Sequence, residues 1–173
     1  MRTLETEGFV LRRRVLRGQD SAYTLFTADL GKLRVIAKGV KKITSKRAPH
    51  LQTGNYVVFL LTHSNEQYYL QDTKLKSGFL SLKDSRLKLE QIYLFLFVLD
   101  RLLAENQPEA EIFNLTRSFF VTLGKQQKEE SIVYTYLNDL LRILGYLSQP
   151  VEKEEVLQVI EKQINEKIPE NII

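Results

Sequence analysis

Residues 31–47 read GKLRVIAKGVKKITSKR, and seven of these seventeen residues are Lys or Arg. In the first part of the stretch, the apolar Leu33 and Val35 alternate with the cationic Lys32 and Arg34. Because successive side chains of a strand point to opposite faces, this alternation predicts a strand with one apolar face and one cationic face. The alternation stops at Gly39, and the Lys-rich residues that follow, with Ser, Thr and Pro among them, predict a basic loop.

This basic stretch lies within a longer window, residues 30–65, that contains no Asp or Glu. Each cation that neutralises a phosphate releases condensed counterions, so a surface without competing carboxylates attracts a polyanion. The alternative is that Lys and Arg only keep exposed strand edges soluble. Together with an arginine cluster that precedes it, the window favours a polyanion-binding surface. Its candidate residues are Arg12, Arg13, Arg14, Arg17, Lys32, Arg34, Lys38, Lys41, Lys42, Lys46 and Arg47.

Five strands are predicted in the first 78 residues, with one long connection between the third and the fourth. The predicted ranges are 4–15, 21–28, a third strand that begins at Gly31, 56–63 and 66–76. Short antiparallel strands in this arrangement are typical of a small closed barrel of the OB type. The fourth strand, YVVFLLTH, is apolar on both faces and is therefore predicted to be covered on both sides.

From residue 80 onward the apolar period becomes that of helices. We expect one helix from a cap at Ser81 or Asp84 to about Glu105, then helices over about 108–124 and 129–144, and an amphipathic segment over 152–168. The predicted fold class is α+β, with an OB-fold nucleic-acid-binding domain at 1–78 and an α-helical domain at 79–173. The first range has a net charge of +8 and the second of −4, which suggests different partners for the two domains.

The composition argues against several classes of function. The chain has no Cys and only two His, so disulfides and thiolate metal sites are excluded and no metal or cofactor is expected. Gly-rich phosphate loops and a GxSxG elbow are absent from the sequence, so we predict a protein that is not an enzyme and has no catalytic residues. The longest apolar run, residues 92–99, is far shorter than the roughly 18 residues of a membrane span, so we expect a cytoplasmic protein without a membrane partner.

Binding of single-stranded nucleic acid also uses exposed aromatic rings, on which bases stack. The candidates are Tyr23, Tyr68 and Tyr69, although an aromatic residue on a barrel strand is more often part of the core. Since Tyr68 and Tyr69 are adjacent, they should point to opposite faces of their strand, and only one of them should fill the barrel.

Several of these stretches together resemble the RecO family of bacterial DNA repair and recombination mediators. They are EGFVLRRR at 7–14, YTLFTADLGKLRVIAKGVKK at 23–42, SKR at 45–47, the L-x-x-G-x-Y-V-x-F pattern at 51–59 and LNDLLRILGYLSQP at 137–150. The resemblance implies an OB domain that binds single- and double-stranded DNA, with the DNA assigned to residues 12–14 and 32–47.

The same resemblance implies strand annealing and, with RecR, loading of the RecA recombinase onto DNA coated by single-strand-binding protein, in the bacterial cytosol or nucleoid after DNA damage. Many family members carry a cysteine-based zinc module soon after the LGY stretch. The absence of cysteine here points to a short form that lacks this module.

The main hypothesis is therefore a non-enzymatic DNA-binding mediator of recombinational repair. Three alternatives stay open from the sequence. One is a protein-interaction adaptor whose OB barrel binds acidic peptide tails, and another is an RNA-binding OB protein. The third is an enzyme with an enclosed, carboxylate-lined pocket.

Overall fold

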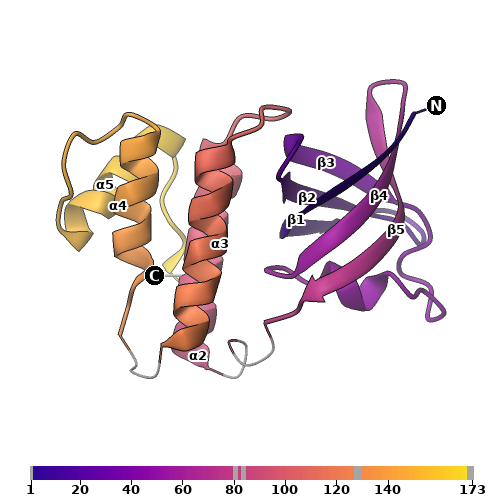
Figure 1. The fold of residues 1–173 in the computed structure, drawn as a ribbon, viewed down its shortest axis with the longest axis horizontal. Helices are drawn as coiled ribbons and strands as arrows, with labels where there is room; N and C mark the ends of the chain where they lie inside the picture. The colour runs from indigo at the N-terminus through magenta and orange to yellow at the C-terminus, as the bar shows by residue number, and fades with distance from the viewer. Residues whose placement is uncertain (1, 80–81, 83–84, 127–129, 171–173) are drawn as a thin grey trace. The chain divides into compact units, whose positions relative to one another are not determined.

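The computed structural model describes residues 2–79, 82, 85–126 and 130–170 (Figure 1). The chain forms two compact units. One contains Met1–Gly78 together with Leu103–Ala110, and the other contains Phe79–Leu102 and Glu111–Ile173. A segment from the second half of the sequence therefore packs with the first unit. The predicted caps Ser81 and Asp84 lie outside the described residues.

The first unit is a closed five-stranded barrel. Its strands are β1 (Arg2–Val15), β2 (Ser21–Thr27), β3 (Gly31–Ala37), β4 (Tyr56–Ser64) and β5 (Gln67–Ser77), in the order β1-β2-β3-β5-β4. The connection between β3 and β4 holds a short 3-10 helix, η1 (Ala48–Leu51). All neighbouring strands are antiparallel except β3 and β5, whose parallel pairing closes the barrel. The predicted OB-type barrel, with its long third connection, is confirmed.

Strand β1 pairs with β4 through its first part and with β2 through its second part, and Gly8 lies where both pairings overlap. A Cβ atom at Gly8 would collide with the carbonyl oxygen of Phe26 and would lie 2.8 Å from the Cα of Thr27. Only glycine allows the strands to approach so closely. Beyond Gly8, a bulge between Val10 and Arg12 shifts the register, so that Val10 and Leu11 are both buried.

The barrel interior is an apolar core made by all five strands and the long connection. Its members are Val10, Tyr23, Leu25, Leu33, Val35, Ala37, Val40, Leu51, Val57, Phe59, Leu61 and Leu70. The predicted alternation of β3 is confirmed, since Leu33, Val35 and Ala37 all lie inside. Strand β4 differs from the prediction. Its inner residues are buried, but Val58 and Leu60 on its other face are only half-buried and line an open groove.

The second unit contains the helices α2 (Arg86–Leu102), α3 (Ala110–Lys125), α4 (Val133–Ile143) and α5 (Lys153–Ile164). The helices expected from the sequence are present, although α2 ends at Leu102 rather than near Glu105. Stacked rings join two of them, with the Phe95 and Phe119 centroids 4.4 Å apart. In the described parts of the chain, no helix has the length and apolarity needed to cross a bilayer.

A polar side chain fixes the first end of α4, and a glycine turn fixes the other. The buried Gln91 of α2 accepts hydrogen bonds through its Oε1 from the backbone N–H groups of Ile132 and Val133, at 2.8 and 3.1 Å. At the other end, Gly145 has a φ of +77° and begins a left-handed turn in which the N–H of Tyr146 donates to the carbonyl of Leu141 at 2.8 Å. The predicted helix stop at Gly145 is confirmed.

One core side chain makes the stability of the barrel depend on pH. Burial raises the pKa of the Tyr23 phenol above 10.0, although Arg13, a hydrogen bond with Ser21, and Arg47 act in the opposite direction. In the unfolded chain the phenol ionises at a lower pH than in the folded chain. The stability that Tyr23 contributes is therefore complete below about pH 10 and is lost as the pH rises through its folded pKa.

We expect the Tyr23→Phe variant to lose less stability than the wild-type chain between pH 8 and pH 10.5, because phenylalanine has no phenol to ionise. Urea unfolding at the two pH values measures the difference. Between pH 7 and pH 8 the two chains should change equally. A larger alkaline loss in the variant would show that the Tyr23 phenol is not held neutral by burial.

Candidate nucleic-acid interface

Cross-strand pairing decides which cationic side chains share a face of the barrel, because residues directly opposite each other on neighbouring strands point to the same side. Arg13 is opposite the core residue Tyr23, so Arg12 and Arg14 on either side of it point outward. Arg12 is opposite Thr24, and Thr24 is opposite Arg34. The exposed arginines that share this outer face are Arg12, Arg14 and Arg34.

A second row of paired residues extends this face to β5. It runs from Arg14 through Ala22, Ile36 and Tyr69 to Thr62. Lys38 follows Ile36 by two residues, and its Nζ lies 5.0 Å from the centroid of the Tyr69 ring. We use the name basic face for the outer surface of β1, β2, β3 and β5 that carries Arg12, Arg14, Arg34 and Lys38.

The basic loop, residues 38–47, is tied to the turn between β1 and β2. The backbone N–H of Gly39 donates to Asp20 Oδ1 at 2.7 Å, and the N–H of Lys41 donates to the carbonyl of Gln19 at 3.0 Å. The Nζ of Lys41 donates to the carbonyl of Leu16 at 2.7 Å. These bonds hold the turn with Arg17 beside the start of the basic loop. Arg17, Lys42 and Lys46 are exposed at this end of the barrel.

Arg47 fastens the other end of the basic loop to β5. Its guanidinium donates to the carbonyls of Lys38 at 2.5 Å and Leu70 at 2.7 Å, and also to that of Gln71 at 3.4 Å. The side chain is half-buried, and its hydrogen bonds to backbone carbonyls give it a structural role, that of holding the basic loop against β5. Its charge still adds to the positive potential of the loop, as does that of Arg13, whose Nε donates to Ser21 Oγ at 3.4 Å.

Lys32 does not belong to the basic face, and its prediction as a surface cation is wrong. It is only 7% exposed, because the segment Leu103–Ala110 runs beside this end of β3. The backbone N–H of Asn106 donates to the carbonyl of Lys32 at 2.8 Å. A Cβ at the neighbouring Gly31, where φ is +70°, would collide with the backbone of Gln107. The covering segment comes from some seventy residues further along the chain.

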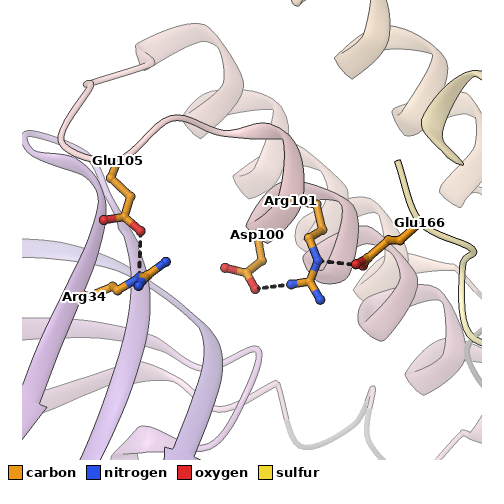
Figure 2. A network of polar contacts seen from close by, with 5 residues as sticks. All are labelled: Arg34, Asp100, Arg101, Glu105 and Glu166. Carbon is orange, nitrogen blue, oxygen red and sulfur yellow. Dashed lines mark hydrogen bonds and ion pairs between the residues drawn. The ribbon is translucent and has the colours of Figure 1, made fainter. Parts of the chain in front are cut away.

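The same segment places a carboxylate on the basic face. Glu105 Oε1 lies 2.7 Å from Arg34 Nε, and the two side chains are partly exposed (Figure 2). The acid-free window of the sequence is therefore not an acid-free surface. Figure 2 also shows a group in the helical unit, where Arg101 pairs with Asp100 at 3.0 Å and with Glu166 at 2.7 Å.

The three candidate tyrosines lie in three different environments. Tyr23 is 2% exposed and belongs to the barrel core, so its prediction as a base-stacking residue is wrong. Tyr68 is half-buried against the core, with its ring centroid 4.4 Å from that of His63. Tyr69 is half-buried on the basic face. The expectation that Tyr68 and Tyr69 point to opposite sides agrees with these positions.

An open groove of about 600 Å³ lies at the β5 side of the basic face. We call it the Tyr69 groove. It is lined by Lys38, Arg47, Thr62, Ser64, Tyr69, Leu70 and Gln71. Sequence reasoning did not single out Thr62, Ser64 and Gln71. They occupy alternate positions of β4 and β5, and this period of two is the one signal that identifies them as outward-facing residues.

The fold and this site define a class of protein, a closed OB-fold barrel with a cationic outer face, followed along the chain by a helical unit. Comparison with known proteins is consistent with the class. Residues 1–79 match the family described as "Recombination protein O N terminal". The chain belongs to the RecO family, which confirms the resemblance found in its sequence.

Several relatives carry the name DNA repair protein RecO. That of Alkaliphilus metalliredigens is 31% identical over 144 residues, which cover 83% of this chain and 57% of the relative. That of Caldanaerobacter subterraneus subsp. tengcongensis is 28% identical over 151 residues, covering 85% and 60%. That of Thermoanaerobacter sp. is 26% identical over 153 residues, covering 86% and 60%. The chain thus spans about three fifths of the length of these relatives, and the short form without a zinc module stays a prediction.

A chain from the crystal structure of the S. pombe Stn1-ten1 complex aligns with 56% of this chain and 77% of its own length. The TM-score is 0.35 and the sequence identity 13%, values too low to support an inference.

The ion pair between Arg34 and Glu105 yields a prediction. We expect the Glu105→Gln variant to bind a single-stranded oligonucleotide more tightly than the wild-type chain at low salt, because Arg34 no longer has a carboxylate partner. Exposed ion pairs are worth about 0.2–1 kcal/mol, so the gain should be roughly 1.5- to 5-fold. Fluorescence anisotropy measures it.

Glu109→Gln, in the same segment, is the matched control, since it removes the same charge at a residue outside this ion pair. An equal gain in oligonucleotide affinity in both variants would show that the effect comes from net charge alone. No gain in either would show that Glu105 does not compete for Arg34.

Proposed function

We propose that this chain is a non-enzymatic, DNA-binding mediator of recombinational DNA repair, which holds single- and double-stranded DNA on the basic face and the basic loop. One observation carries the proposal. Arg12, Arg14, Arg34 and Lys38, which come from two separate stretches of sequence, share one face of an OB barrel. The names of the relatives, which are DNA repair proteins, support the same role.

Phosphate contacts would supply the affinity. Each cation that neutralises a phosphate releases condensed counterions, and contacts to the backbone carry no sequence information. The residues between the cations are uncharged and half-buried or buried, namely Ala22, Thr24 and Ile36. The cationic side chains therefore project from an uncharged surface, over which a DNA backbone can pass. Such a surface binds DNA of any sequence.

The same electrostatics would promote strand annealing. Two complementary strands repel each other through their phosphates, and a surface that neutralises both lowers this repulsion. The exposed loop residues Arg17, Lys42 and Lys46 add cations next to the basic face, which gives a second strand a place to bind. Annealing then needs no bond-making group, in keeping with a protein that is not an enzyme.

The family resemblance suggests the partners. We propose that the chain acts with RecR and with single-strand-binding protein in the bacterial cytosol or nucleoid, and that it helps to load recombinase onto damaged DNA. Residues 79–102 and 111–173, which form the helical unit, carry 11 Lys or Arg and 13 Asp or Glu, a net charge of −2, whereas the barrel unit has a net charge of +6. The helical unit is therefore a poorer DNA surface than the barrel and a better candidate for protein contacts.

Salt dependence tests the proposal. Replacing Arg12, Arg14 and Lys38 together by Gln should reduce the slope of log affinity against log salt for single-stranded DNA by about 2, since each phosphate contact contributes roughly 0.7. The matched control replaces Arg117, Lys125 and Lys162, three exposed cations of the helical unit. It removes the same total charge and should leave the slope near that of the wild-type chain.

An unchanged slope in the first variant would contradict the placement of DNA on the basic face. Two further ligands at matched salt separate the alternative functions. Tighter binding of RNA than of DNA of the same sequence would favour an RNA-binding protein. Tighter binding of an acidic peptide than of either nucleic acid would favour an adaptor.

A further inference from the structure

We propose that the Tyr69 groove is a subsite for a single unstacked nucleobase, so that the chain distinguishes single-stranded from double-stranded DNA. The inference rests on the proposed function, because the base arrives as part of a strand already bound on the basic face. It goes further by assigning one chemical group of that strand to one place in the fold.

The position of Tyr69 is the first argument. Its neighbour Tyr68 packs against the core, but Tyr69 stays on the outer surface, opposite Ile36 of β3 and Thr62 of β4. Its ring is half-buried in a wall of the groove, directly beside the cations of the basic face. A nucleotide offers a flat base and an anionic phosphate joined by one sugar, and this pair of groups matches an aromatic ring beside a cation.

Lys38 provides the second argument. Its ammonium lies over the Tyr69 ring, 5.0 Å from the centroid. At an exposed site a stacked base contributes more binding free energy on an aromatic ring than an ammonium group does. A base can therefore take the place of Lys38 on the ring, and the long side chain of Lys38 is free to turn toward the phosphate. The exchange replaces one weak contact by two stronger ones.

The polar groups of the groove provide the third argument. The Gln71 side-chain amide donates to Thr62 Oγ1 at 2.8 Å, which uses one of its two N–H donors and fixes its orientation. The amide also has a carbonyl acceptor, and the Ser64 hydroxyl both donates and accepts. The edges of all four bases carry donors or acceptors, so these groups can bind any base. Arg47 keeps the wall in place through its three carbonyl partners.

The size of the groove fits the same ligand. A volume of about 600 Å³ falls within the range of roughly 300–1,000 Å³ found for small-molecule sites. A paired base inside a duplex cannot enter without unstacking and unpairing, which costs free energy. A single strand can place a base in the groove at much lower cost. The groove therefore favours single strands, whereas the basic face alone attracts both forms.

The test compares wild-type chain, Tyr69→Ala and Tyr69→Phe by fluorescence anisotropy at one salt concentration. The three probes are a labelled oligo-dT strand, a strand of equal length whose nucleotides are abasic, and a duplex of that length. We expect Tyr69→Ala to bind oligo-dT about 5- to 150-fold more weakly, the loss of one stacked base, with duplex and abasic affinities within twofold of wild type. Tyr69→Phe keeps the ring and should bind oligo-dT like the wild-type chain.

Equal losses on all three probes would overturn the inference, because the ring would then support the fold of the face rather than bind a base. A wild-type chain that binds abasic and base-bearing strands equally would overturn it as well, and this comparison does not depend on how well a variant folds. Failure of the proposed function gives a different result, in which the wild-type chain binds none of the three probes.

Discussion

The parallel pairing of β3 with β5 is the constraint on which the candidate site depends. It closes the barrel and sets Ile36 opposite Tyr69, which brings the end of β3 with Lys38 next to a ring that lies more than thirty residues away in sequence. Arg47 reinforces the same junction by joining the basic loop to the carbonyls of β5. Without this closure the cations of β3 and the polar residues of β4 and β5 would not share a surface.

The electrostatic character of the face results from the tertiary fold as much as from the local sequence. Closing the barrel gathers cations from β1 and β3, while the bulge in β1 decides which arginines point outward. The segment Leu103–Ala110 acts in the opposite sense, since it covers Lys32 and brings Glu105 to Arg34. The basic face is therefore smaller than the basic sequence, and one of its arginines already has an anionic partner.

Local patterns in the sequence were sufficient for the barrel, the alternation of β3 and the helical stop at Gly145, because each depends on the period or the backbone geometry of one element. They failed where residues distant in sequence meet. From the sequence alone, Tyr23 could be a surface aromatic residue. Its pairing with Arg13 and Val35 across neighbouring strands places it in the core. Nothing near Lys32 in sequence indicates that residues 103–110 cover it. The double coverage expected for β4 failed for a similar reason, since an apolar outer face does not specify what packs on it.

The central claim is that DNA lies across the outer surface of β1, β2, β3 and β5. The most direct measurement is amide chemical-shift mapping by NMR of the whole chain titrated with a short single-stranded oligonucleotide. The account predicts that the largest shifts fall in residues 12–14, 22–24, 34–47 and 69–71, with small shifts in α2 to α5. Shifts that concentrate in the helices, or on the groove at Val58 and Leu60, would contradict it.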